Sequence, residues 1–87
     1  MSNYHINLEV YNALDGVLRI IAVLRKAKLK YHRLEARIIE KDKAIINLEV
    51  SGSVNELKWL IKKLERIPEV YYVFLSKDVN VLKELMR

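Results

Sequence analysis

The sequence contains no cysteine, threonine or glutamine, and its 87 residues include only two glycines and one proline. Without cysteine there is no disulfide framework, thiol nucleophile or thiolate metal site. Two glycines cannot supply the glycine-rich loops that bind nucleotide phosphates. No apolar run approaches the roughly 20 residues of a membrane-spanning helix. The opening "MSNYHINLEV" also lacks the charged and apolar regions of a signal peptide. We therefore expect a cytoplasmic protein with no membrane segment, bound metal or cofactor.

The composition is that of one small folded domain, with 52% hydrophobic and 31% charged residues. Much of the net charge of +5 comes from "RKAKLKYHR" (residues 25–33), where five cations meet no acid. Such a cluster can contact nucleic-acid phosphates, or it can be the cationic end of a helix followed by a solvated loop. We favour the second interpretation, because aromatic stacking motifs are missing and acids elsewhere dilute the basic field. Nucleic acid is therefore not an expected partner.

The first third of the chain predicts a strand followed by a helix. Residues 4–11 alternate strictly, which indicates a half-buried strand with Tyr4, Ile6, Leu8 and Val10 on its inner face. Asp15 is predicted to be the helix N-cap, and apolar residues then recur at helical spacing. These residues are Val17, Ile20, Ile21, Leu24 and Ala27. Leu18, Ala22 and Val23 widen this apolar stripe, so we expect part of the helix to meet a second body.

The remainder predicts a hairpin, a helix and a final strand. Leu34, Ala36 and Ile38 point inward in one strand, residues 41–43 make a polar turn, and residues 44–50 form the next strand. "SGS" at 51–53 breaks this pattern, and Ser53 with Glu56 fits a capping box. The helix that follows turns Leu57, Leu60, Ile61 and Leu64 inward and ends before Pro68. Residues 69–76 form the last strand, and residues 77–87 are expected to form a short terminal helix.

The order β-α-β-β-α-β predicts an α+β, ferredoxin-like fold with two helices on one face of a four-stranded antiparallel sheet. Right-handed crossovers give the strand order 4-1-3-2. We assign residues 1–76 to this domain and residues 77–87 to the tail. The sheet edges are then residues 30–40 and 69–76. Because the second edge reads "VYYVFL", it invites pairing with another chain, and we expect a homodimer.

The sequence offers little catalytic chemistry, so we do not expect an enzyme. His5 and His32 fall on different strands, and neither has a carboxylate nearby in the sequence at a spacing typical of a catalytic or metal site. We interpret them as partly exposed strand residues, in preference to a metal-binding pair across a dimer. Ser51 and Ser53 resemble turn and cap residues. Trp59 lies off the inner stripe of its helix and is expected to be at least half exposed. It is either a residue that anchors contact with a partner protein or an isolated apolar residue on the surface.

The stretch "NALDGVLRI" at residues 12–20 resembles the turn between the first strand and helix of ACT domains, which are small ligand-binding regulatory modules. Its matching residues are Asn12, Gly16, Leu18, Arg19 and Ile20. Within that family, the later part of the chain is similar to the short, single-domain type of small regulatory subunit of acetolactate synthase. That likeness is carried by Leu60, Lys62 or Lys63, Leu64, Val70 and Val73.

The resemblance implies a dimer in which two ACT domains form one eight-stranded sheet with four helices on one face. It also implies that an effector such as valine binds between the domains, its carboxylate meeting backbone N–H groups of Asp15, Gly16 and Val17 beside Asn12. The alternative is that Gly16 only makes the turn. Valine-sensing members carry a glycine and then an asparagine at the start of strand two, where this chain has Lys28 and Lys30. Lys30 is therefore included among the candidate effector-binding residues.

The function implied by this resemblance is regulatory and non-catalytic. The chain would bind and activate the thiamine-diphosphate-dependent catalytic subunit of acetolactate synthase, which opens branched-chain amino-acid biosynthesis. The alternative is a stand-alone ACT domain that senses an amino acid for another enzyme or regulator.

Overall fold

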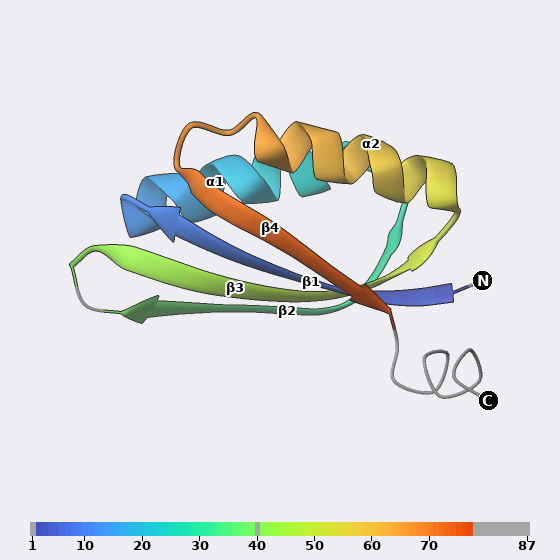
Figure 1. Cartoon of the computed structure of the whole chain (residues 1–87), viewed down its shortest axis with the longest axis horizontal. Coiled ribbons are helices and arrows are strands. Elements are labelled where there is room, and N and C mark those ends of the chain that lie inside the picture. Colours follow the sequence, from blue (N-terminus) through green and yellow to red (C-terminus); the bar gives the residue numbers. More distant parts are fainter. Residues whose placement is uncertain (1, 40, 78–87) are drawn as a thin grey trace.

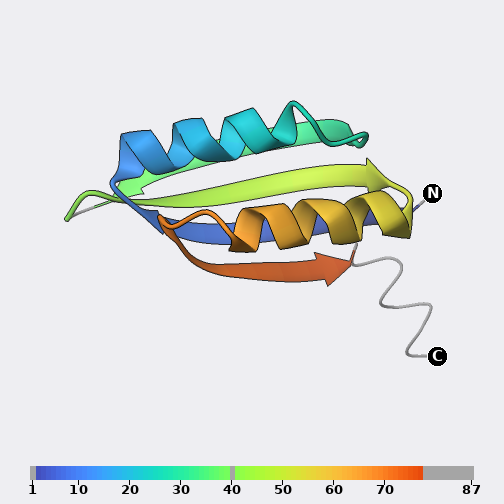
Figure 2. The same cartoon turned by 90° about the horizontal axis from the view of Figure 1, so that it is seen from above.

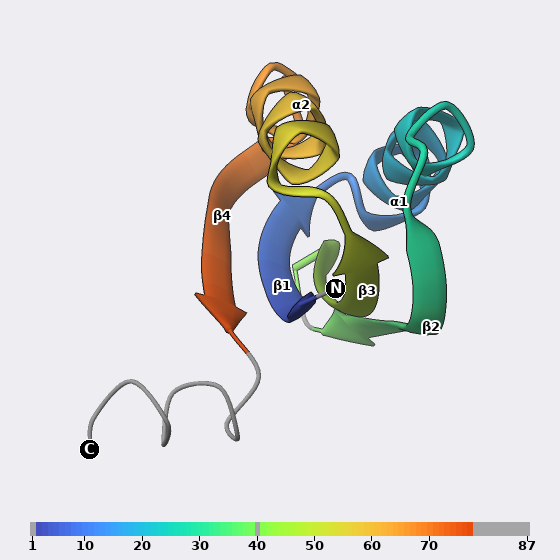
Figure 3. The ribbon, with the colours of Figure 1, turned by 90° about the vertical axis from the view of Figure 1, so that its right-hand side faces the viewer.

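The computed structural model describes residues 2–39 and 41–77, which form six elements of secondary structure (Figure 1). In chain order they are β1 (Ser2–Tyr11), α1 (Ala13–Leu24), β2 (Lys30–Ile39), β3 (Lys43–Gly52), α2 (Val54–Glu65) and β4 (Val70–Lys77). The strands form one antiparallel sheet in the order β2-β3-β1-β4, which is the predicted order 4-1-3-2. Both helices lie on the same side of the sheet (Figure 3). The predicted fold class and strand order are confirmed.

The core lies between this sheet and the two helices. The predicted inner faces of β1, β3 and α2 are buried apart from Ile61, which is only partly buried. They are buried because alternate strand residues and every third or fourth helix residue point to the same side. The buried apolar residues of these three elements are Tyr4, Ile6, Leu8, Val10, Ala44, Ile46, Leu48, Val50, Leu57, Leu60 and Leu64. The opposite face of the sheet is not covered by either helix (Figure 1). Among the described residues, no helix is long and apolar enough to cross a membrane.

The start of α1 differs from the prediction, because Asn12 and not Asp15 is the N-cap. Asn12 adopts a left-handed conformation with φ 47° and ψ 63°, which asparagine tolerates better than most residues. Its side chain makes no capping hydrogen bond. Instead, the Asp42 carboxylate and carbonyl accept the Ala13 N–H at 3.1 and 3.2 Å. The turn therefore closes one residue after β1, and Asp15 falls inside the first helical turn.

Gly16 packs the first turn of α1 tightly against the end of β1. It is buried, and a Cβ added there would lie 2.9 Å from the Tyr11 carbonyl oxygen and 3.0 Å from Val10 Cγ2. Its backbone is not left-handed, since the positive-φ residue at this turn is Asn12. Asn12 therefore supplies the left-handed backbone of the turn, and Gly16 has a packing role beside it. What the position requires is the absence of a side chain.

The inner face of β2 is the predicted one, but it is largely uncovered. Leu34 lies opposite Leu48 and Ile38 lies opposite Ala44, so both point to the helix side of the sheet. Their exposed fractions are nevertheless 49% and 66%. The reason is that α1 packs mainly over β3 and β1, whereas β2 is the edge strand.

The other elements follow the prediction with shifted ends. The Ser53 hydroxyl accepts the Glu56 N–H at 3.2 Å, so this half of the predicted capping box is present. β3 continues through Gly52, whereas the prediction ended it at residue 50. The apolar spacing extended to Ala27, but α1 ends at Leu24. The predicted terminal helix over residues 77–87 lies, apart from Lys77, outside the described residues.

We predict that Gly16→Ala destabilises the fold although alanine is the better helix former. The propensity gain is about 1 kcal/mol, whereas forcing a methyl group against the Tyr11 carbonyl and Val10 costs roughly 1–3 kcal/mol. Urea unfolding should therefore show a net loss of stability, with Ala22→Gly at an exposed position of α1 as a control for propensity alone. A Gly16→Ala variant more stable than the wild type would contradict the packing argument.

We also predict that Tyr31 contributes pH-dependent stability. Its hydroxyl donates to the Leu24 carbonyl at 2.7 Å, and burial raises the pKa of the Tyr31 phenol above its ordinary value. The raised pKa means that the fold favours the neutral phenol. This stabilisation is full below about pH 10, the unfolded-state pKa, and is lost as pH rises through the folded-state pKa. Tyr31→Phe should lower the free energy of unfolding by about 1 kcal/mol at neutral pH.

The measurement is urea unfolding of the wild type, Tyr31→Phe and the exposed control Tyr72→Phe between neutral and alkaline pH. The difference between wild type and Tyr31→Phe should shrink above about pH 10. A difference that stayed constant across this range would show that the Tyr31 phenol does not titrate with folding.

Candidate functional site

The start of α1 holds four of the five candidate effector-binding residues. Asn12, Asp15, Gly16 and Val17 lie within one helical turn, directly after β1. The Gly16 N–H donates to the Asn12 carbonyl at 2.8 Å, as the first regular hydrogen bond of the helix. It is therefore not free to meet a carboxylate, and Val17 lies one residue further into the helix. The N–H groups without an intrahelical acceptor are those of Leu14 and Asp15.

Lys30 lies at the opposite end of α1 from the other candidates. The Tyr31–Leu24 hydrogen bond joins the beginning of β2 to the end of α1, whereas Asp42 beside Ala13 marks the other end. The helix has 12 residues, so these ends are about 18 Å apart. Figure 2 shows β2 and α1 running in opposite directions. A single copy of the chain therefore does not bring Lys30 to the start of α1.

An apolar surface runs along α1 and the neighbouring edge strand β2. We call it the α1–β2 surface, and it consists of Leu14, Leu18, Ile21, Leu34 and Ile38. Leu14, Leu18 and Ile21 follow one another at helical spacing on one side of α1. Ile21 and Leu34 also line an apolar hollow of about 250 Å³ between the two elements. The sequence predicted the surplus apolar residues of α1, but not their continuation onto β2.

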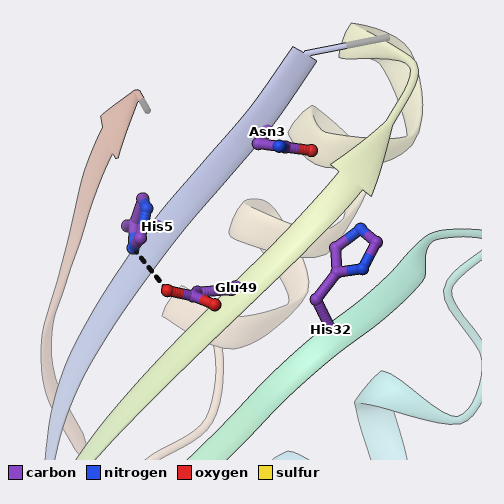
Figure 4. A pocket seen from close by; sticks show the side chains of 4 residues that line it. All are labelled: Asn3, His5, His32 and Glu49. Carbon is purple, nitrogen blue, oxygen red and sulfur yellow. Dashed lines mark ion pairs between the residues drawn. The ribbon is translucent and has the colours of Figure 1, made fainter. Parts of the chain in front are cut away.

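The open face of the sheet carries a polar hollow of about 230 Å³ lined by Asn3, His5, His32 and Glu49 (Figure 4). His5 Nδ1 lies 3.6 Å from Glu49 Oε1 across β1 and β3. His32 Nε2 lies 2.8 Å from the hydroxyl of Ser51, which is only 5% exposed. Both contacts join residues far apart in the sequence. The strand order and a register shift in β2 beside His32 create them, which is why sequence spacing gave no signal.

This hollow does not assemble a catalytic triad within the described residues. Glu49 pairs with His5, whereas Ser51 contacts His32. A triad needs one histidine that contacts both the serine and the carboxylate, and here two different histidines make these contacts. Residues 2–39 and 41–77 also contain no group of three or more histidine or acidic side chains placed to hold a metal ion. The side chains that line this hollow include both hydrogen-bond donors and hydrogen-bond acceptors.

Several of the charges on the open face are paired with one another. Arg33 and Glu35 are 2.9 Å apart, and their hydrogen bond lowers the pKa of the Glu35 carboxyl. Lys43 lies 3.8 Å from Glu9. Beside Lys43, the rings of Tyr11 and Tyr71 lie with their centroids 3.8 Å apart and their planes tilted by 56°. The neighbouring Tyr71 phenol, together with burial, raises the pKa of Tyr11. The interspersed carboxylates disfavour a nucleic-acid backbone on this face.

Trp59 is less exposed than predicted. Its exposed fraction is 36%, whereas we expected at least half. It borders a hollow between the α1–β2 loop and α2, and Lys63 Nζ lies 5.7 Å from the centroid of its ring. These neighbours cover part of the indole. The prediction considered the helix alone and therefore overestimated the exposure of Trp59.

No protein-family model and no curated protein matches this sequence. Solved structures do match the fold. The chain is similar to the ACT domain from GTP pyrophosphokinase of Chlorobium tepidum, with a TM-score of 0.76 and 15% identity over 87% of this chain and 100% of that one. An uncharacterized protein from Thermotoga maritima matches with a TM-score of 0.74 and 17% identity over 86% and 94% of the two chains.

A third structure is the C-terminal domain of the MgtC protein from Mycobacterium tuberculosis. It matches with a TM-score of 0.68 and 12% identity over 90% of this chain and 88% of that one. The three proteins have different names and share one architecture, so the likeness establishes the fold and does not by itself assign a function. The chain has the ferredoxin-like fold that is found in ACT domains.

Proposed function

We propose that this chain is a non-catalytic regulatory subunit of the ACT type, which dimerises and activates the catalytic subunit of acetolactate synthase. Three lines support the proposal. The fold is similar to that of an ACT domain, residues 12–20 resemble the ACT turn, and residues 46–73 resemble the small subunit of this synthase. The observation that carries it is the uncovered α1–β2 surface, because a regulatory module needs surfaces for other chains.

The α1–β2 surface suits a second copy of the chain. β2 is an edge strand with one unpaired side, and its uncovered Leu34 and Ile38 continue onto α1. Antiparallel pairing of two β2 strands would extend the sheet to eight strands with all four helices on one face. It would bury apolar groups of both copies and satisfy backbone groups at both edges. This is our reason for choosing β2 over β4, whose exposed Tyr72 and Phe74 point to the open face of the sheet.

The same pairing would complete the effector site. Because the strands are antiparallel, Lys30 of the partner subunit would approach the end of β2 that lies beside the start of α1. An amino acid there could place its carboxylate near that ammonium and the N–H groups of Leu14 and Asp15. The Asp15 carboxylate could accept hydrogen bonds from the ammonium group of the bound amino acid. A site shared in this way would couple effector binding to the dimer.

The test is the activity of the synthase catalytic subunit from the same organism, with and without this chain, each with and without valine. We expect stimulation by the wild type. Ile38→Glu should abolish dimerisation and stimulation, because it places charges in the proposed interface. Phe74→Glu is the matched control at a similarly exposed position of the opposite edge, and it should retain both. Unchanged synthase activity with excess folded wild-type chain would refute the proposal, and amino-acid binding without stimulation would then favour the stand-alone sensor.

We predict that Asp15→Asn and Lys30→Ala each weaken amino-acid binding. Each change removes one charge from the proposed site, and a lost charge-assisted contact costs on the order of 1.5–3 kcal/mol, or about 10- to 150-fold in affinity. Calorimetry with a panel of amino acids that includes valine measures the effect, with Lys58→Ala, at an exposed position in the first half of α2 and away from the start of α1, as a control. If both variants bound with wild-type affinity, the site would not lie between the start of α1 and the partner.

A further inference from the structure

The α1–β2 loop and α2 form a hollow of about 400 Å³ that neither the fold nor the proposed dimer uses. We call it the basic hollow, and it is lined by Lys26, Lys28, Asn55, Glu56 and Trp59. The helices run in opposite directions, so the end of α1 and the start of α2 meet at one end of the molecule (Figure 2). Side chains about 30 positions apart in the sequence are thereby brought together.

The charge of this region is strongly positive. Lys26 and Lys28 belong to the acid-free stretch of residues 25–33. Lys62 and Lys63 follow Trp59 by three and four residues, so they lie on the same side of α2. Within residues 2–39 and 41–77, none of these four lysines forms an ion pair. Glu56 is the one acid that lines the hollow. The lysines outnumber this acid, so the hollow keeps a net positive field that attracts carboxylates.

Trp59 adds an apolar contact to this field. An indole that remains 36% exposed beside lysines presents a flat apolar surface whose burial by a partner is favourable. The Asn55 side chain, one helical turn earlier, carries both a donor and an acceptor that can meet a peptide backbone. Positive charge, one large aromatic side chain and an amide together match an acidic segment that also has apolar side chains.

We propose that the basic hollow is a docking site for an acidic segment of a partner protein, held by Lys26 and Lys28 and anchored by an apolar side chain against Trp59. The inference deepens the proposed function and rests on it, since the site is the surface by which the regulatory subunit reaches its client. A protein segment suits the hollow better than nucleic acid. Lys26 and Lys28 lie together at one end of the molecule, and Glu9, Glu35 and Glu49 on the open face would repel a backbone that continued across it.

Trp59 is the only tryptophan of the chain, so its fluorescence reports on the basic hollow directly. The probe is a short synthetic peptide of alternating glutamate and leucine, titrated into the full chain at low salt. Matched probes are a peptide of alternating lysine and leucine and a single-stranded oligothymidylate. We expect a saturable shift of the Trp59 emission with the acidic peptide alone, weakening as salt rises.

Lys26→Glu with Lys28→Glu should weaken peptide binding at least about tenfold. Both residues are exposed, so the variant should fold normally. The matched control is Arg37→Glu with Lys41→Glu, which changes the net charge equally at exposed positions away from the hollow and should bind within about twofold of the wild type. Equal losses in both variants, or no emission change with the acidic peptide, would overturn the inference. A response to the oligonucleotide without one to the peptide would overturn it in favour of nucleic acid.

The synthase assay separates this inference from the proposed function. If the wild type stimulates the synthase and the Lys26→Glu, Lys28→Glu variant does so equally, the docking site is wrong and the regulatory function stands. If the acidic peptide binds as expected but the wild type fails to stimulate, the docking site stands and the assignment to this synthase is wrong.

Discussion

The antiparallel pairing of β1 with β3 is the constraint on which the rest of the structure depends. It runs without a register shift from Ser2 opposite Gly52 to Tyr11 opposite Lys43. This pairing places the inner side chains of both strands under the two helices and leaves β2 and β4 as edges. It also fixes the start of α1, because the turn between β2 and β3 places Asp42 where it accepts the Ala13 N–H. The exposure of Leu34 and Ile38 on β2 follows from this arrangement, because β2 is left at the edge of the sheet.

Much of the fold could be predicted because its signals are local. Strict alternation in β1 and β3 and the apolar spacing of α2 identified the buried faces, and the order of elements then restricted the topology. The predicted N-cap failed for a physical reason. The N-cap residue is Asn12, and the acceptor for the Ala13 N–H is Asp42, 29 residues after Ala13 in the sequence. No local pattern reports such a contact. Asp15 has the right chemistry for an N-cap but lies in the helix's first turn.

The candidate site was predictable only in part, because it depends on what lies beside each element. Gly16 was singled out correctly as unusual, but its reason is the approach of α1 to Val10 and Tyr11. Lys30 and the start of α1 are separated by the length of the helix, which residue numbers alone do not show. The contacts of His32 with Ser51 and of His5 with Glu49 arise from strand pairing across the sheet. Leu34 and Ile38 have the alternation of core residues, but an edge strand leaves them uncovered.

The α1–β2 surface and the basic hollow are chemically distinct. The α1–β2 surface is apolar and continuous with an unpaired strand edge, which suits a second copy of the chain. The basic hollow is charged and holds one aromatic side chain, which suits a different and acidic partner. In the proposed function, the first surface would serve assembly of the dimer and the second would serve contact with a client.

The central claim is that β2 pairs with the β2 strand of a second copy, and amide hydrogen exchange followed by nuclear magnetic resonance tests it most directly. Backbone N–H groups on the outer side of β2 should become protected as protein concentration rises through the dimerisation range, whereas those on the outer side of β4 should exchange rapidly throughout. Rapid exchange along β2 at every concentration, or protection that develops along β4 instead, would contradict the account.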